Sequence, residues 1–217
     1  RENSDRTELN KCARITFAKG DITDIDSLRN GIPEGIDAVF HIAASVENLP
    51  HHLESTRYKI NQEGTKNVIE ICLEKKIKRL VYTTTVLTLD FHASRPLTEN
   101  SPSNEWCRDS YIHSKKLADD EVKKAKEKGL DVVFMHPSAI FGSYDKATWS
   151  KMFLEIERGL PLPFAPPGGG SVCYVREVAK AHVTAFSNSI SGEHYILGGP
   201  DETWLSVAKM IAKILNK

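Results

Sequence analysis

RLVYTTTV at residues 79–86 and DVVFMHP at residues 131–137 decide the fold of this 217-residue chain. The first run is rich in β-branched residues and the second is apolar at most positions, which is typical of buried strands in a parallel sheet. Between them, DSYIHSKKLADDEVKKAKEKG (109–129) has the length and polarity of a helix that ends near Gly129. A strand, a helix and a second strand in this order predict a β-α-β unit with parallel strands.

The same alternation continues on both sides of this unit. RITFA (14–18) and DAVFHIA (37–43) are strand-like, and NQEGTKNVIEICLEKK (61–76) has helical spacing, with Asn61 as the expected N-cap. The proline- and glycine-rich stretch at 159–171 predicts no regular structure. The remaining expected elements are a helix at 148–159, a strand at 172–175, a helix at 177–188, a strand at 194–197 and a helix at 204–216. The rhythm predicts an α/β fold: a doubly wound parallel sheet with helices on both faces.

The composition argues against two classes of partner, nucleic acids and membranes. Lys and Arg total 29, as do Asp and Glu, so the net charge is zero and no nucleic-acid partner is expected. No apolar run approaches the length of a membrane span, so no membrane partner is expected either. The cysteines form no metal-binding or disulfide pattern, which fits a reducing, cytoplasmic location, and the histidines form no metal motif. The four cysteines are Cys12, Cys72, Cys107 and Cys173.

Small or polar residues follow the three central predicted strands. They are His41–Ala44, Thr83–Thr85 and His136–Ser138. In doubly wound sheets the ligand binds at the carboxyl ends of the strands, where the strand order reverses. Tyr111 opens the helix between the last two of these strands, and Lys115 follows one turn later. The pair is therefore expected beside the ligand.

Tyr111 and Lys115 point the same way on a helix, because positions i and i+4 share a face. A free tyrosine has a pKa of about 10, and an ammonium about 4 Å away favours the phenolate by roughly 4 kcal/mol at an effective dielectric constant of 20. This would bring the tyrosine pKa towards 7, while burial acts in the opposite direction. With a threonine hydroxyl nearby for the substrate oxygen, such a pair suits proton transfer coupled to hydride transfer from a nicotinamide. The alternative is that both residues only pack or are solvated.

Six segments in order resemble the extended short-chain dehydrogenase/reductase family, in particular its dihydroflavonol-reductase-like and sugar-epimerase-like members. The segments are GDITD (20–24), VFHIAA (39–44), NQEGTKNVIEIC (61–72), VYTTTV (81–86), YIHSK (111–115) and HPSAIFG (136–142). The resemblance implies a Rossmann-like nucleotide-binding core at 1–142 and a small C-terminal substrate lobe at 143–217. It also implies an NAD(P)-dependent oxidoreductase that acts on a carbonyl or a secondary alcohol.

The resemblance further assigns roles to single residues. Tyr111 would be the general acid/base, Lys115 its partner and ribose anchor, and Thr85 the donor to the substrate oxygen. Asp21 would contact the adenine. The other residues that would line the cofactor are Ile22, Ala43, Ala44, Thr83, Pro137, Ser138 and Ile140. The helices at 61–76 and 111–128 would form the seam of a homodimer.

Four departures from the family pattern keep alternatives open. The sequence holds no glycine-rich G-x-x-G-x-x-G turn, so the first β-α-β unit is expected to be absent from this chain. By alignment, Arg1 falls near the end of the second strand, where a guanidinium could meet a 2′-phosphate, which leans to NADP over NAD; the alternative is an arginine that faces solvent. Thr85, Val86 and His136 stand where serine, alanine and arginine are usual. A catalytically silent NAD(P)-binding protein and a nucleotide-sugar epimerase or dehydratase therefore remain alternatives.

The substrate is a small molecule whose identity the sequence leaves open. Aromatic residues in the variable segments favour a hydrophobic ring or a steroid-like carbonyl compound, although any of them could belong to the core. They are Phe91, Trp106, Trp149, Phe153 and Phe164.

Overall fold

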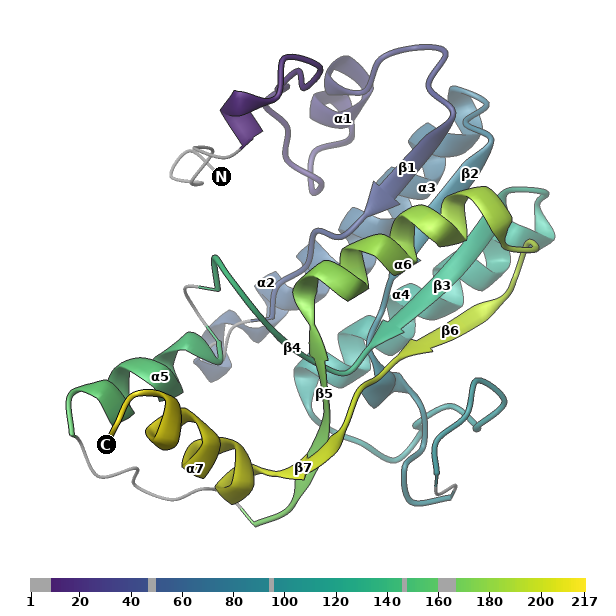
Figure 1. The fold of residues 1–217 in the computed structure, drawn as a ribbon. Coiled ribbons are helices and arrows are strands. Elements are labelled where there is room, and N and C mark those ends of the chain that lie inside the picture. The colour runs from purple at the N-terminus through teal and green to yellow at the C-terminus, as the bar shows by residue number, and fades with distance from the viewer. Residues whose placement is uncertain (1–8, 47–49, 94–95, 146–147, 160–166) are drawn as a thin grey trace.

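The computed structural model describes residues 9–46, 50–93, 96–145, 148–159 and 167–217. Its central sheet has four strands in the order β1-β2-β3-β6 (Figure 1). Every neighbouring pair in this sheet is parallel. The strands are β1 (Ala38–His41), β2 (Arg79–Thr83), β3 (Asp131–Pro137) and β6 (His194–Leu197). The predicted parallel α/β architecture is confirmed.

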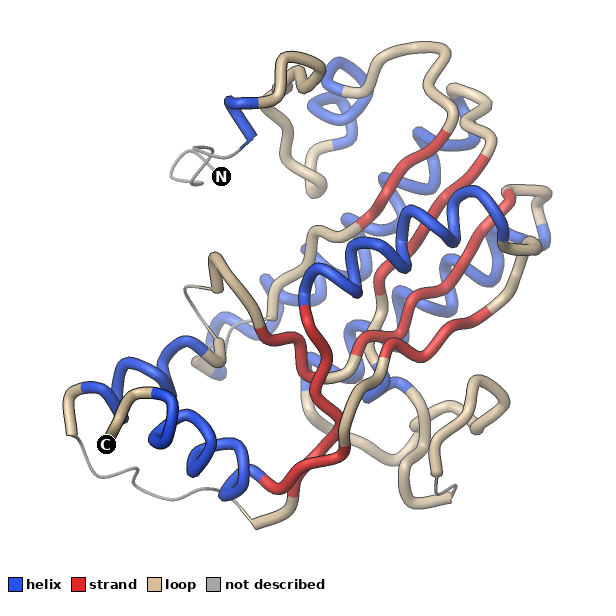
Figure 2. Tube along the Cα trace, in the orientation of Figure 1, coloured by secondary structure: helices blue, strands red, loops and turns tan. Residues whose placement is uncertain are grey.

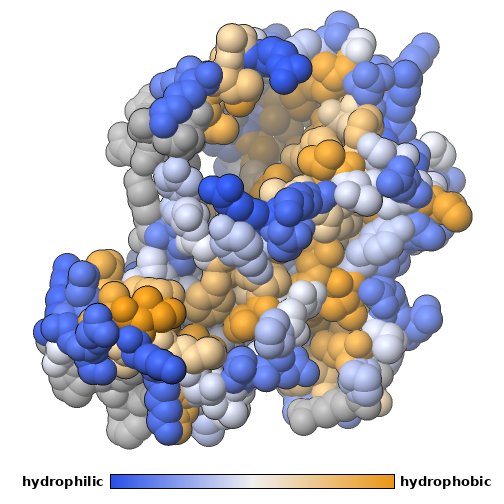
Figure 3. Space-filling view, viewed as in Figure 1, coloured by the Kyte–Doolittle hydropathy of each residue, from blue (hydrophilic) through white to orange (hydrophobic). Residues whose placement is uncertain are grey.

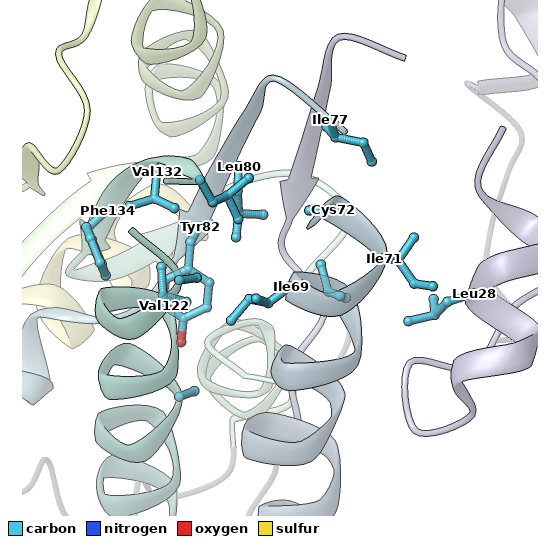
Figure 4. Packing of buried hydrophobic residues seen from close by; sticks show 14 residues of the cluster. Leu28, Ile69, Ile71, Cys72, Ile77, Leu80, Tyr82, Val122, Val132 and Phe134 are labelled. Carbon is cyan, nitrogen blue, oxygen red and sulfur yellow. The ribbon is translucent and has the colours of Figure 1, made fainter. Parts of the chain in front are cut away.

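Helices cover both faces of this sheet, which explains why apolar residues dominate the middle of β2 and β3. The helices α3 (Gly64–Glu74) and α4 (Ser110–Glu127) lie behind the sheet in Figure 1, and α6 (Val175–Asn188) lies in front. Successive side chains of a strand point to opposite faces, so a strand covered twice needs apolar residues at every position. Leu80, Tyr82, Val132 and Phe134 pack with α3 and α4 (Figure 4), whereas Val81, Val133 and Met135 pack with α6.

A smaller sheet lies beside the carboxyl ends of the main strands (Figure 2). Its strands are β4 (Ala139–Phe141), β5 (Gly169–Tyr174) and β7 (Asp201–Thr203), in the order β4-β5-β7. The helices α5 (Ser150–Glu157) and α7 (Trp204–Ile214) accompany it, and Ile156, Val207 and Ile211 form their common core. No helix within the described ranges is long and apolar enough to cross a membrane.

Shorter elements connect the layers. The chain contains α1 (Ile25–Gly31), α2 (Glu54–Tyr58), the π-helical turn η3 (Lys59–Glu63), and the 3₁₀ turns η1 (Leu9–Lys11), η2 (His51–Leu53) and η4 (Val86–Thr88). Asp24 caps α1, because its carboxylate accepts the backbone N–H groups of Asp26 and Ser27.

Residues 14–18 form no strand, so that prediction is wrong. A strand is stabilised by the hydrogen-bond ladder that it shares with a neighbouring strand. Among the described residues β1 pairs only with β2, so residues 14–18 share no ladder with β1. At β1 and just beyond it, Phe40 and Ile42 are 40% and 63% exposed. Figure 3 shows hydrophobic surface inside the hollow between the N-terminal segment and the rest of the molecule.

Two further predictions are corrected. Asn61 is not an N-cap, because the helical segment begins at Glu54 and Asn61 lies inside η3 with its side chain buried. Gly169–Ser171, expected to lack regular structure, form the first half of β5. A Cβ atom on Gly169 would lie 2.1 Å from the carbonyl oxygen of Glu202 on β7, so this glycine allows the two backbones to approach.

Candidate active site

Thr83 ends β2, Thr84 and Thr85 follow it, and each of the three has a different partner. The Thr83 hydroxyl lies 2.8 Å from His182 Nε2, and His182 Nδ1 donates to the Val178 carbonyl at 2.8 Å; in the neutral ring this leaves Nε2 to accept the Thr83 proton. The Thr84 N–H donates to the carbonyl of Met135 on β3 at 2.8 Å. Thr85 begins η4, where its hydroxyl accepts the N–H of Leu87. The strand end is thereby tied to α6, to β3 and to the following turn.

Tyr111 and Lys115 both face this strand end from α4. The Asp109 carboxylate caps the helix by accepting the N–H of Tyr111 at 2.9 Å, which places Tyr111 in the first turn. Lys115 is 2% exposed, and its Nζ donates to the Thr83 carbonyl at 2.9 Å and lies 4.6 Å from the Tyr82 ring centroid. The Thr85 side chain is near enough to the Tyr111 phenol to lower its pKa. The three predicted catalytic side chains thus lie around the end of β2.

The electrostatics of the pair differ from the expectation. Burial raises the pKa of Tyr111 to about 12, and the contact with the Thr85 hydroxyl and the charge of Arg57 oppose this rise. Burial lowers the pKa of Lys115 to about 8. The expectation that Lys115 brings the tyrosine pKa close to 7 is wrong for this state, because desolvation is the largest effect and Lys115 is not among the groups that lower this pKa. Tyr111 is therefore a protonated phenol near neutral pH.

The helix at 59–74 carries polar side chains that hold the neighbouring loops. Asn61 accepts the N–H of Ser45 at 2.7 Å and donates to the Ser45 carbonyl at 3.1 Å and to the Ser114 hydroxyl on α4 at 2.9 Å. The Thr65 hydroxyl donates to the Asn61 carbonyl at 2.6 Å and accepts from His41 Nε2 at 2.9 Å. This segment thereby fixes the chain that follows β1.

Gly64 and Asn67 hold the earlier loop against the same helix. A Cβ atom on Gly64 would lie 2.8 Å from the side chain of Ile22, and the Asn67 amide donates to the Ile22 carbonyl at 2.8 Å. The sequence analysis missed these roles. The signal was available, because four polar or small residues recur at helical spacing in NQEGTKN.

The predicted cofactor residues of the first half of the chain have different surroundings. The Asp21 carboxylate accepts the N–H and hydroxyl of Thr23, each at 2.9 Å, so it stabilises its own turn. Ile22 packs on Gly64. Ala43 is exposed and Ala44 is half-buried, in the segment between β1 and the Ser45 anchor. Arg1 lies outside the described residues.

The residues predicted after β3 lie where β3 leads into β4. Pro137 is buried, and Ile140 is half-buried in β4. The N–H and the hydroxyl of Ser138 both donate to the Leu197 carbonyl on β6, at 3.0 and 3.1 Å. Pro137 and Thr83 thus end the two neighbouring strands on which the site is built.

His136 supports Thr85 from β3, a role that the sequence analysis missed. Its Nδ1 donates to the Thr85 carbonyl at 3.3 Å, and its Nε2 lies 2.8 Å from Nδ1 of His194 on β6. The Thr85 bond places the proton on Nδ1, so Nε2 accepts from His194. Burial lowers the pKa of both rings to about 4, which keeps them neutral at physiological pH.

Aromatic side chains line a cavity beside the smaller sheet. The cavity has a volume of about 550 Å³ and is lined in part by Phe141, Trp149 and Phe153. Trp149 stacks between Phe141 and Trp204, with ring centroids 4.9 and 4.6 Å apart. Phe91 and Trp106 pack against each other elsewhere, with centroids 5.4 Å apart. Phe164 lies outside the described residues.

The residues present fit one half of a nicotinamide nucleotide. An ammonium and a phenol face the strand ends. A segment with only methyl side chains, Ala43 and Ala44, follows the neighbouring strand, so a ligand could approach its backbone closely. The Asp21 carboxylate is engaged with Thr23, and the glycine-rich turn that holds the pyrophosphate in Rossmann folds is absent from the sequence.

Known proteins are similar to this chain over most of its length. The chain is 29% identical over 190 residues to 3beta-hydroxysteroid-dehydrogenase/decarboxylase isoform 1 of Arabidopsis thaliana, which covers 85% of this chain and 43% of that protein. It is 28% identical over 194 residues to cinnamoyl-CoA reductase 1 of Petunia hybrida, which covers 84% of this chain and 57% of the relative. This chain thus spans about half the length of these relatives.

Solved structures share the fold. The crystal structure of gox2253 superposes with a TM-score of 0.85 at 28% identity, over 99% of this chain and 65% of that one. The structure of the DesIV dTDP-glucose 4,6-dehydratase from Streptomyces venezuelae has a TM-score of 0.83 at 22% identity, over 96% and 66% of the two chains. The match to the 3-beta hydroxysteroid dehydrogenase/isomerase family covers residues 1–197, and the chain belongs to this family.

Proposed function

We propose that this protein is an NAD(P)-dependent oxidoreductase that reduces a carbonyl to a secondary alcohol, with Tyr111, Lys115 and Thr85 at its centre. The observation that carries the proposal is their convergence at the end of β2: Lys115 Nζ donates to the Thr83 carbonyl, and the Thr85 side chain is near enough to the Tyr111 phenol to lower its pKa. The relatives named above as a dehydrogenase and a reductase support the same class of reaction.

The protonation of the site favours reduction. A phenol with a pKa of about 12 holds its proton near neutral pH, so Tyr111 is suited to donate that proton to a carbonyl oxygen. The Thr85 hydroxyl, which is near the Tyr111 phenol, orients the same oxygen. The Lys115 ammonium stabilises the phenolate left after the proton has moved. A bound nicotinamide would supply the hydride.

Lys115 and the segment around Ala43 and Ala44 would hold the ribose and nicotinamide side of the cofactor. The preference for NADP over NAD stays a prediction, and it rests on Arg1. The cavity lined by Phe141, Trp149 and Phe153 is mostly apolar, although Asp145 and Ser150 also line it, and its aromatic side supports a substrate with a hydrophobic ring system.

The experiment is Tyr111→Phe in the complete protein, with consumption of NADPH and NADH measured against a panel of apolar carbonyl compounds. Loss of the proton donor is expected to reduce turnover by at least ~100-fold. Tyr195→Phe is the matched control, because its hydroxyl bonds Glu193 rather than the site. Unchanged turnover in Tyr111→Phe would overturn the proposal. Activity without net consumption of cofactor would instead favour an epimerase.

A further inference from the structure

A single carboxylate is buried close to the catalytic lysine. Asp119 follows Lys115 by one turn of α4, and the two side chains are 4% and 2% exposed. No other Asp or Glu is buried among the side chains that the structure describes. An ionised group inside a protein is costly unless an opposite charge or hydrogen bonds compensate it. The presence of two opposite charges one turn apart therefore needs a reason.

Both charges lie around the same tyrosine of β2. The Lys115 ammonium lies over the Tyr82 ring, and the Asp119 carboxylate is near enough to the buried Tyr82 phenol to raise its pKa. The hydroxyls of Thr84 and Thr88 are near enough to Asp119 to lower its pKa, although Asp119 Oδ1 has no hydrogen-bond partner among the described residues. The carboxylate thus belongs to the environment of Lys115 and lies away from the surface where a substrate could reach it.

We propose that Asp119 is the internal counter-charge of Lys115, a positioning residue that keeps the lysine charged and seated on the Thr83 carbonyl during the reaction. The inference rests on the proposed function, since the charge of Lys115 affects turnover only if Lys115 serves the chemistry. Asp119 acts through Lys115 and touches neither substrate nor cofactor.

The electrostatics of the two groups agree with this role. Burial lowers the pKa of Lys115 to about 8, and the Asp119 charge raises it. Burial raises the pKa of Asp119, and the Lys115 charge is the largest opposing effect. Each group thus favours the charged form of the other. The further groups that face this pair are His41 on β1, Tyr82 on β2, His136 on β3, His194 on β6, and Tyr111 and Lys123 on α4.

The first test is the pH profile of kcat/KM for Asp119→Asn in the complete protein, from about pH 6 to about pH 10. Without the counter-charge Lys115 loses its proton more easily, so the alkaline limb is expected to move by ~1 pH unit to lower pH. Asp119→Glu restores the carboxylate and is expected to return the limb towards its original position. Asp120→Asn is the control, because Asp120 pairs with Lys116 at the surface. Coincident profiles for Asp119→Asn and the parent would overturn the proposal.

The second test needs no activity and so separates this inference from the proposed function. Urea unfolding midpoints are compared for Lys115→Met, Asp119→Asn and the double variant. Each single change leaves one buried charge uncompensated, so the double variant is expected to lose less than the sum of the two single losses. Additive losses contradict the pairing. If Asp119→Asn does not fold, recovery of folding in the double variant supports the pairing, and failure to recover contradicts it.

Discussion

Replacing Asn61 by alanine should lower the free energy of unfolding by more than is usual for a polar residue on a helix. The side chain is 1% exposed and makes three hydrogen bonds, two to the backbone of Ser45 and one to the Ser114 hydroxyl. A neutral hydrogen bond contributes about 0.5–1.5 kcal/mol, and partners left unsatisfied in the interior add to the loss. The free energy of unfolding should therefore fall by about 2–4 kcal/mol.

Urea unfolding followed by circular dichroism measures this loss. Asn67→Ala is the matched control, because Asn67 is on the same helix and donates one hydrogen bond, to the Ile22 carbonyl. Its loss should be about 1 kcal/mol. Asn61→Ala should also weaken NAD(P) binding in the complete protein, since Ser45 anchors the segment that holds Ala43 and Ala44. A loss in Asn61→Ala no larger than that in Asn67→Ala would refute the reasoning.

Two other predictions concern the backbone of β5 and the buried lysine. Gly169→Ala should lower the free energy of unfolding by about 1–3 kcal/mol, because its Cβ would meet the Glu202 carbonyl. Gly170→Ala should change it little, because the nearest atom to its Cβ would be on the Trp204 side chain, at an ordinary contact distance of 3.7 Å. Equal losses in thermal unfolding would contradict this. The pKa of Lys115 is about 8 in the folded protein and 10.5 in the unfolded chain. Between these pH values the unfolded chain binds more protons, so the free energy of unfolding should rise with pH, by up to about 3 kcal/mol. Urea unfolding should show that rise in the parent and a smaller one in Lys115→Met, and parallel curves would refute it.

Much of the site could be predicted because it depends on short-range geometry. The i and i+4 spacing of Tyr111 and Lys115 places both side chains on one helix face whatever surrounds them. The apolar runs at 79–86 and 131–137 require burial on both faces, which brings the Thr83–Thr85 and His136–Ser138 segments to one edge of the sheet. The structure has this arrangement.

Other features could not be predicted, because they depend on neighbours that are distant in the sequence. RITFA (14–18) has strand propensity, but a strand forms only beside a partner. Asn61 has the residue type of an N-cap, yet its partners are Ser45 and Ser114. The pKa of Tyr111 depended on two opposing effects, and only the packing of the site showed that desolvation is the larger.

The amino-acid sequence alone determined the α/β class, the parallel β-α-β connection between β2 and β3 and the identity of the residues at the carboxyl end of β2, because periodicity and residue type are local properties. The tertiary structure decided which polar groups bond to each other and what charge they hold. Desolvation and hydrogen bonding are collective: the pKa of Tyr111 and of Lys115 follows from every side chain packed around it, and no single segment of sequence contains that information.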